Sequence, residues 1–190
     1  MNTKEWNLLD KLISRYRLWV AAKYIEDDDV VLDLGCGVQH YLLTCGKNKF
    51  RLGYGLDYDV KDSQEGNIHL LNYKYQGRLP LKEGFFDKVF LLAVLEHIEV
   101  KEVQALFFEF SRVLKKKGRV IITTPTPRAK AVLEFLAFKL KVVTVEEVTD
   151  HKHYYIAKEI YGLADACGLK VSAAKLFQLG LNSLYILEKP

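Results

Sequence analysis

The sequence has no apolar run of the roughly 18 residues that a membrane-spanning helix needs. The N-terminal stretch MNTKEWNLLDKLISRYRLWV carries charges throughout, so it lacks the continuous apolar core of a secretory signal peptide. Only three cysteines are present, without CxxC or Cys/His metal spacing, which favours reduced thiols over disulfides. We therefore expect a reduced, cytoplasmic location.

A strong charge of one sign is also missing. The formal net charge is +4, and the basic residues are scattered rather than interleaved with aromatic ones, which disfavours a nucleic-acid partner. The chain is 49% hydrophobic and 27% charged, the balance of a globular protein. Its 190 residues suffice for one core and show no linker or repeat, so we expect a single domain over residues 1–190.

Apolar spacing predicts alternating helices and strands. Helical periodicity covers residues 4–25, a segment starting near 39, and residues 100–118, 127–140 and 157–168. Strand patterns cover residues 30–34, 51–58, 67–72, 86–94, 119–125, 170–177 and 183–189. This alternation predicts an α/β fold with an open, mostly parallel sheet that ends in an antiparallel hairpin. Three lysines and Gly118 are expected to end the helix that starts at residue 100.

Two glycines follow the first predicted strand, in VVLDLGCGVQHY. In a sheet of this kind the ligand lies beyond the carboxyl ends of the strands, and the first strand-to-helix turn faces it. Glycine lets the chain turn tightly and lets a ligand approach without meeting a Cβ atom. Gly35 and Gly37 are thus consistent with a ligand at this turn, although a tight turn alone would also require them.

The neighbouring residues indicate which ligand this is. Asp57 ends the second strand about 20 residues further on, where a carboxylate accepts hydrogen bonds from both ribose hydroxyls. His40 occupies the third glycine position of the dinucleotide fingerprint, which disfavours a nucleotide-dependent oxidoreductase. Asp33 lies just before the glycines, where it would repel a pyrophosphate but suit the α-ammonium of a methionine moiety. These residues together favour S-adenosylmethionine.

Several motifs in order resemble the class I S-adenosylmethionine-dependent methyltransferases, and more narrowly their methyltransferase type 11 branch. VVLDLGCG is similar to the first motif of that family, and GLDYD to its acidic second-strand motif. RLPLKEGFFDKVFLLAVLEHI and FSRVLKKKGRVIITTP are similar to the stretches around the fourth and fifth strands. DHKHYYIAKEIYGLADACGLKV is similar to a downstream segment that borders the substrate. The resemblance runs from about residue 29 to the C-terminus.

The resemblance implies a Rossmann-like open sheet of seven strands in the order 3-2-1-4-5-7-6, with strand seven antiparallel and helices on both faces. It also implies the cofactor site. Asp33, Gly35, Cys36 and Gly37 would line the methionine end, Asp57 would hold the ribose, Tyr58 would lie beside the adenine, and Ala93 would contact the cofactor through its backbone.

The sequence departs from the family pattern at two positions. Gln39 stands where the family often has another glycine, so the turn is wider or Gln39 itself contacts the ligand. The aspartate that usually follows strand three to bind the adenine amino group is absent. Asn72 or Tyr73 would substitute for it, since an asparagine oxygen also accepts from an amino group.

Methyl transfer requires mainly that the methyl group and the nucleophile be held in line, and a general base helps where the nucleophile carries a proton. The candidate bases are His97, His151 and His153, each of which a structural role would also explain. The H-x-H pair in DHKHYY suggests metal ligation, but no third ligand is apparent in the sequence. We therefore predict no metal.

The acceptor is predicted to be small and partly apolar, including a lipid-like one. No NPPY-like stretch follows strand four, and Thr126 stands where a base-attacking cysteine would be expected. Helix 1–25 and residues 125–155, a candidate substrate cover, are rich in apolar side chains, although a packing helix with a basic rim would look alike. We expect the acceptor near Tyr16, Trp19, His151 and Tyr154. The alternative is a protein that binds S-adenosylmethionine without turnover, as a sensor or partner subunit.

Overall fold

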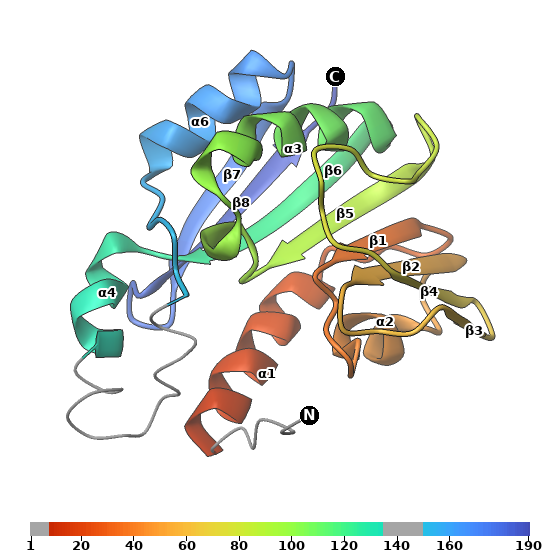
Figure 1. Cartoon of the computed structure of the whole chain (residues 1–190), viewed down its shortest axis with the longest axis horizontal. Coiled ribbons are helices and arrows are strands. Elements are labelled where there is room, and N and C mark those ends of the chain that lie inside the picture. The colour runs from red at the N-terminus through yellow and green to blue at the C-terminus, as the bar shows by residue number, and fades with distance from the viewer. Residues whose placement is uncertain (1–7, 135–149) are drawn as a thin grey trace.

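The computed structural model describes residues 8–134 and 150–190 (Figure 1). Its helices are α1 (Leu8–Ala22), α2 (Tyr41–Gly46), the 3-10 turn η1 (Leu95–His97), α3 (Val100–Val113), α4 (Pro127–Glu134) and α6 (Ala157–Ala166). Its strands are β1 (Val30–Leu34), β2 (Leu52–Asp57), β3 (Ser63–Glu65), β4 (Ile68–Asn72), β5 (Phe86–Leu92), β6 (Leu114–Pro125), β7 (Lys170–Phe177) and β8 (Asn182–Glu188).

The strands form one sheet in the order β3-β4-β2-β1-β5-β6-β8-β7. Strands β4, β2, β1, β5 and β6 are mutually parallel, and β8 pairs antiparallel with both β6 and β7. The predicted Rossmann-like fold and terminal hairpin are confirmed, and the seven predicted strands follow the predicted order, but the predicted count is wrong because the sheet has eight strands. The eighth strand, β3, pairs antiparallel with β4 at the edge, and its three exposed residues, Ser-Gln-Glu, carry no apolar pattern that would predict it.

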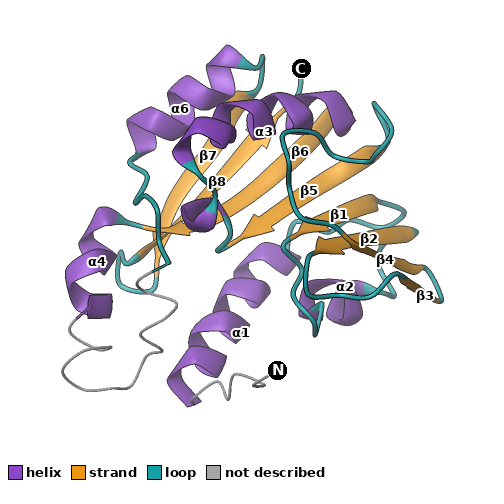
Figure 2. Ribbon diagram, in the orientation of Figure 1, coloured by secondary structure: helices purple, strands orange, loops and turns teal. Residues whose placement is uncertain are grey.

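Helices cover both faces of the sheet (Figure 2). Val30, Leu32 and Leu34 of β1 join the core beneath α3 and α6, whereas the intervening Val31 joins the core beneath α1 and α2. Successive strand side chains point to opposite faces, so a strand covered on both sides is apolar throughout. Because helices cover both faces, the carboxyl ends of the central strands are where functional side chains can reach a ligand.

The predicted end of the helix that begins at Val100 is wrong. Helix α3 stops at Val113, and the three lysines and Gly118 belong to the start of β6. The ladder pairs Phe86 with Leu114 and then Lys88 with Arg119, so β6 bulges between these pairs. A Cβ atom on Gly118 would lie 2.9 Å from the Lys115 carbonyl oxygen. The glycine therefore serves this bulge rather than a helix cap.

Helix α1 is anchored to the far end of the sheet. The side-chain amide of Gln178, in the β7–β8 turn, donates to the carbonyl of Ile13 at 2.9 Å, and Ala21 is fully buried in the core. Residues 1–7 of the predicted first helix and 135–149 of the predicted cover lie outside the described residues. None of the helices that the structure describes has the length and apolar character to cross a membrane.

Candidate active site

The two glycines after β1 serve different purposes. Both adopt positive φ, +76° at Gly35 and +66° at Gly37, a region that favours glycine. A Cβ atom on Gly35 would lie 2.3 Å from a methyl carbon of Val94, which follows β5. A Cβ atom on Gly37 would meet nothing within 4 Å. Gly35 thus allows the turns after β1 and β5 to pack, and Gly37 faces open space where a ligand can approach.

Asp57 holds this turn from the end of β2. One carboxylate oxygen accepts from the backbone N–H of Gly37 at 2.9 Å, and the other accepts from that of Asp59 at 2.9 Å. Each carboxylate oxygen has two acceptor sites, so these bonds leave capacity for ribose hydroxyls. An open glycine beside a fixed carboxylate fits the nucleoside part of S-adenosylmethionine.

Asp33 is a buried residue at the same edge and is only 4% exposed. Burial, with a further contribution from the negative charge of Asp57, raises the pKa of Asp33 to about 7. Asp33 is therefore only partly ionised near pH 7, and a nearby positive charge would favour its ionised form. The methionine ammonium group of the cofactor would supply such a charge.

The side chains of Cys36 and Asn72 are directed toward the protein rather than outward. A Cβ atom on Gly55 would lie 2.8 Å from the Cys36 sulfur, so this thiol packs over β2, and burial raises its pKa. The Asn72 amide nitrogen donates to the carbonyls of Tyr58 and Val60 at 2.8 and 2.7 Å. Asn72 thereby fixes the loop after β2, and its side-chain oxygen is the atom suited to an adenine amino group.

Two aromatic residues complete the predicted adenine end. Tyr58 follows β2 with 65% of its surface exposed, which makes its ring accessible to a ligand. The Tyr73 hydroxyl donates to the carbonyl of Arg78, so its proton is already used within the chain. Of the two predicted substitutes for the missing aspartate, Asn72 is therefore the better placed chemically.

The chain turns sharply after β5. Ala93 has φ +57°, and its N–H donates to the Thr123 carbonyl at 2.9 Å. A left-handed conformation costs a non-glycine residue about 1 kcal/mol or more, and such strain concentrates at functional sites. The turn brings η1, with Glu96 and His97, to the same edge as the glycine turn.

The three candidate histidines separate into two places. The Nδ1 atom of His97 lies 3.0 Å from a carboxylate oxygen of Asp150, and the rings of His97 and His151 are 4.9 Å apart. His151 Nδ1 lies 2.8 Å from the Tyr154 hydroxyl oxygen. His153 pairs instead with Glu159 of α6 at 2.8 Å. The structure thus brings His97, His151 and Tyr154 together and directs His153 elsewhere.

Burial and nearby charges shift the pKa values of two residues of this cluster, His151 and Asp150. Burial, together with the positive charge of His97, lowers the pKa of His151 to about 4, so His151 is neutral at pH 7. Burial works to raise the pKa of Asp150, but hydrogen bonds from His97 and Lys152 bring it below its ordinary value. His151 is consequently a weak proton acceptor. In its neutral form His97, which Asp150 orients, is the other candidate for general-base work.

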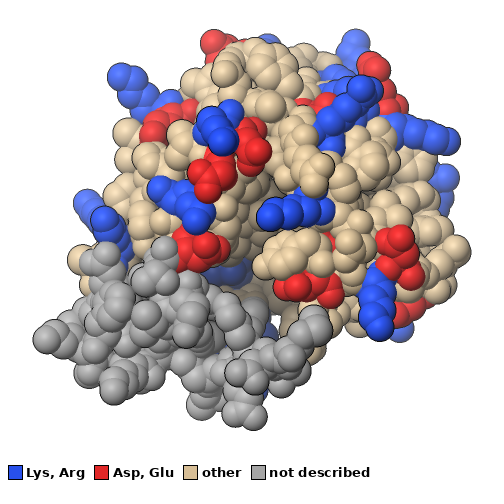
Figure 3. Space-filling view, in the orientation of Figure 1, with Lys and Arg blue, Asp and Glu red and all other residues tan. Residues whose placement is uncertain are grey.

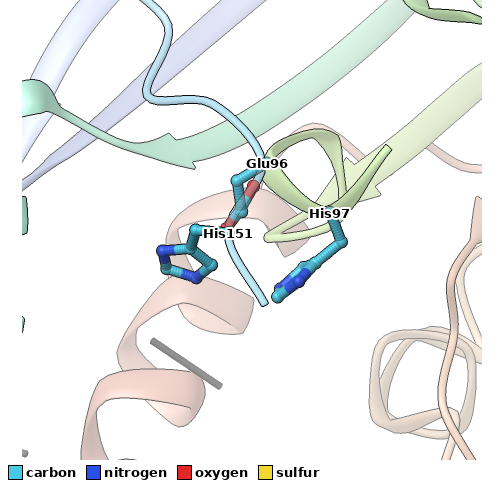
Figure 4. Close-up of side chains that lie close together, drawn as sticks. All are labelled: Glu96, His97 and His151. Atoms are coloured by element: carbon cyan, nitrogen blue, oxygen red, sulfur yellow. The ribbon is translucent and has the colours of Figure 1, made fainter. Parts of the chain in front are cut away.

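Sequence reasoning missed Glu96, which is 2% exposed beside His97. Its carboxylate accepts from the Thr124 hydroxyl at 3.1 Å, and its backbone carbonyl accepts from the Lys152 N–H at 2.7 Å. Burial raises its pKa. The sequence signal that could have identified Glu96 is its position next to His97, just after a buried strand. Figure 4 shows Glu96, His97 and His151 side by side.

The predicted acceptor residues of α1 lie in a separate group. Tyr16 stacks on Trp19 with ring centroids 5.6 Å apart and also contacts Phe177 at 6.1 Å, while the Lys23 ammonium lies over the Trp19 ring. Tyr16 and Trp19 are 45% and 56% exposed. The α1 residue whose charge acts on Glu96 and His151 is Arg17.

A glycine turn and carboxylates at the carboxyl edge of a Rossmann-like sheet define an α/β protein that binds a nucleoside cofactor. The chain belongs to the methyltransferase domain family, whose model matches residues 5–174. It is a methyltransferase, and its cofactor is S-adenosylmethionine, as the sequence motifs predicted. No curated protein sequence matches the chain.

Solved structures share the fold at low sequence identity. A chain from the complex between the Haloferax volcanii Trm112 methyltransferase activator and a methyltransferase is 15% identical, with a TM-score of 0.72 and coverage of 93% of this chain and 88% of that one. A Pyrococcus horikoshii protein is 19% identical, with a TM-score of 0.69 and coverage of 98% and 94%. A Methanosarcina mazei S-adenosylmethionine-dependent methyltransferase is 18% identical, with a TM-score of 0.65 and coverage of 90% and 96%.

Proposed function

We propose that the protein transfers the methyl group of S-adenosylmethionine to a small, partly apolar acceptor. The observation that carries this proposal is the group formed by His97, His151 and Tyr154 next to the turn after β5. This group adjoins the glycine turn, because Val94 packs over Gly35. The acceptor would lie between this group and α1. When bound, the cofactor supplies a methyl group on a sulfonium, which is a good leaving group.

The chain's own residues would perform three tasks. The turn at Gly37 and the carboxylate of Asp57 would hold the nucleoside, and buried Asp33 would face the methionine ammonium. The His97–Asp150 pair would accept a proton from an acceptor that carries one. The exposed rings of Tyr16 and Trp19 on α1 would shield the acceptor from water and contact its apolar part.

Charge on the surface supports a small acceptor over a nucleic acid. On the face shown in Figure 3, lysines and arginines are interspersed with acidic residues rather than gathered in one basic patch. We propose the single domain over residues 1–190, with residues 125–155 contributing to the cover. A cytoplasmic location is supported by three cysteines that are all free.

The test is transfer of a labelled methyl group by the full chain to a panel of phenols, hydroxy fatty acids, amines, peptides and RNA. We expect product with small apolar acceptors. Label only in RNA or peptide would contradict the proposal. Cofactor binding without any product would instead favour the alternative of a sensor or partner subunit.

A matched pair of variants tests the role of α1. Tyr16→Ala should raise the KM for the acceptor about tenfold, the result of losing roughly 1.4 kcal/mol of apolar contact. Tyr161→Ala is the control, because Tyr161 lies on α6 and is 48% exposed against 45% for Tyr16. Equal KM values in both variants would remove Tyr16 from the acceptor site.

A further inference from the structure

Glu96, His97 and His151 place three potential ligand atoms, one from each residue, within 4.8 Å of one another. Glu96 and His97 come from η1, and His151 comes from the segment before α6 (Figure 4). Two imidazoles and one carboxylate form a ligand set that binds first-row divalent metals and leaves coordination positions open.

Each of the three side chains is already oriented by a partner. His97 Nδ1 lies against the Asp150 carboxylate, His151 Nδ1 lies against the Tyr154 hydroxyl, and Glu96 accepts from Thr124. Metal-binding histidines usually engage their second ring nitrogen in this way, which directs the other nitrogen to the metal. The two Nε2 atoms are therefore the ones suited to coordinate an ion.

Several charges face this cluster. Asp150 carries negative charge beside His97, and Lys152 contacts Asp150 at 3.4 Å. Arg17 of α1 brings positive charge that acts on Glu96 and His151. A buried carboxylate favours a nearby cation, and Arg17 and a metal ion would compete for that role.

We propose that Glu96, His97 and His151 bind one divalent transition-metal ion, and that this ion coordinates a hydroxyl oxygen of the methyl acceptor. The identity of the acceptor rests on the proposed function, but the metal site does not. At the ion, the acceptor oxygen forms a bond to the metal while its O–H bond breaks. The oxygen keeps the electron pair, and the proton passes to water rather than to the His97–Asp150 pair, because His97 then binds the ion. The acceptor is thereby held as an oxyanion at the edge where the methyl group is delivered.

The experiment uses the full chain, stripped of metal with EDTA and titrated with Co²⁺, followed through its visible absorption. The wild type should bind one ion per chain. Glu96→Gln keeps the shape and the Thr124 contact but removes the charge, and it should weaken Co²⁺ binding about 100-fold or more. His97→Ala, at a side chain that is 31% exposed, is a second test and should also weaken Co²⁺ binding.

The matched control is His153→Ala, because His153 belongs to the same H-x-H motif but pairs with Glu159. It should bind Co²⁺ as the wild type does. Arg17→Gln should bind Co²⁺ more tightly, because it removes the competing charge. A wild type that takes up no Co²⁺, or the same loss of affinity in Glu96→Gln and His153→Ala, would overturn the metal site.

Two further measurements separate this inference from the proposed function. Cofactor binding by calorimetry without Co²⁺ binding would overturn the metal site and leave the proposed function intact. Addition of catechol, a hydroxyl-bearing probe, should shift the Co²⁺ absorption band of the wild type. Co²⁺ binding with no shift would overturn the coordination of an acceptor oxygen.

Discussion

The cofactor turn and the histidine cluster lie at the same edge of the sheet, but they are built differently. In the turn, Gly37 and Asp57 are 20 residues apart and joined by one hydrogen bond across two paired strands. In the cluster, His97 and Asp150 are 53 residues apart and meet only because the segment before α6 returns to η1. The turn is thus encoded locally, whereas the cluster depends on the whole fold.

The largest effect is expected where the two regions touch. Gly35→Ala places a Cβ atom against Val94 at a positive φ, and the sum of overpacking and backbone strain should lower the free energy of unfolding by about 2–4 kcal/mol. Gly37→Ala has the same type of φ but open space, so it should lose about 1 kcal/mol. Urea denaturation measures both.

For cofactor affinity we expect the opposite order of the two variants. Gly37→Ala fills the space through which the cofactor approaches the turn, so it should weaken cofactor binding more than Gly35→Ala does in the folded protein. A second change, Val94→Ala, should restore part of the stability of Gly35→Ala by making room for the new methyl group. If Gly35→Ala unfolds no more readily than Gly37→Ala, the contact with Val94 is not what requires the first glycine.

The next largest effect is expected for the carboxylate of Asp57 in the cofactor turn. Asp57→Ala should weaken S-adenosylmethionine binding by about 1.5–3 kcal/mol, the range for hydrogen bonds to a charged group, as measured by calorimetry. Asp59→Ala is the matched control, because Asp59 contacts Asp57 through its backbone N–H, which that change retains. Unchanged affinity in a folded Asp57→Ala protein would remove Asp57 from the ribose site.

Asp33 gives the turn a pH dependence. Its pKa is raised from 3.8 to about 7 in the folded chain, so the contribution of Asp33 to stability is fully present below pH 3.8 and is lost as pH rises through 7. Asp33→Asn lacks this loss. The free energy of unfolding of Asp33→Asn, relative to that of the wild type, should therefore rise by about 2 kcal/mol between roughly pH 5.5 and 8.5. A constant difference across this range would show that Asp33 is not titrating.

The smallest effect is expected in the histidine cluster. Asp150 is 58% exposed at its side chain, and exposed ion pairs contribute about 0–1 kcal/mol. Asp150→Asn should therefore change the free energy of unfolding by less than about 1 kcal/mol, while lowering the rate of methyl transfer because His97 loses the carboxylate that orients it. A stability loss as large as that of Gly35→Ala would mean that the cluster holds the fold together.

The alternation of apolar runs by itself determined the α/β class, because strands buried on both faces are apolar throughout, whereas the order of the strands came from the family resemblance of the motifs. The spacing from the glycines to Asp57 determined the cofactor turn. Strand β3 and the end of α3 were not predicted. Strand β3 is short and polar, and a glycine after three lysines is as typical of a helix cap as of the strand bulge that Gly118 occupies.

Only the tertiary structure decided which histidines share a site. In the sequence, His151 and His153 form an H-x-H pair, and Glu96 is one acidic residue among 24. In the fold, the Lys152 N–H binds the Glu96 carbonyl, which places His151 beside His97, while Glu159 draws His153 away. Contacts between segments so far apart depend on backbone hydrogen bonds that no local pattern records, so the third ligand became visible only in the folded chain.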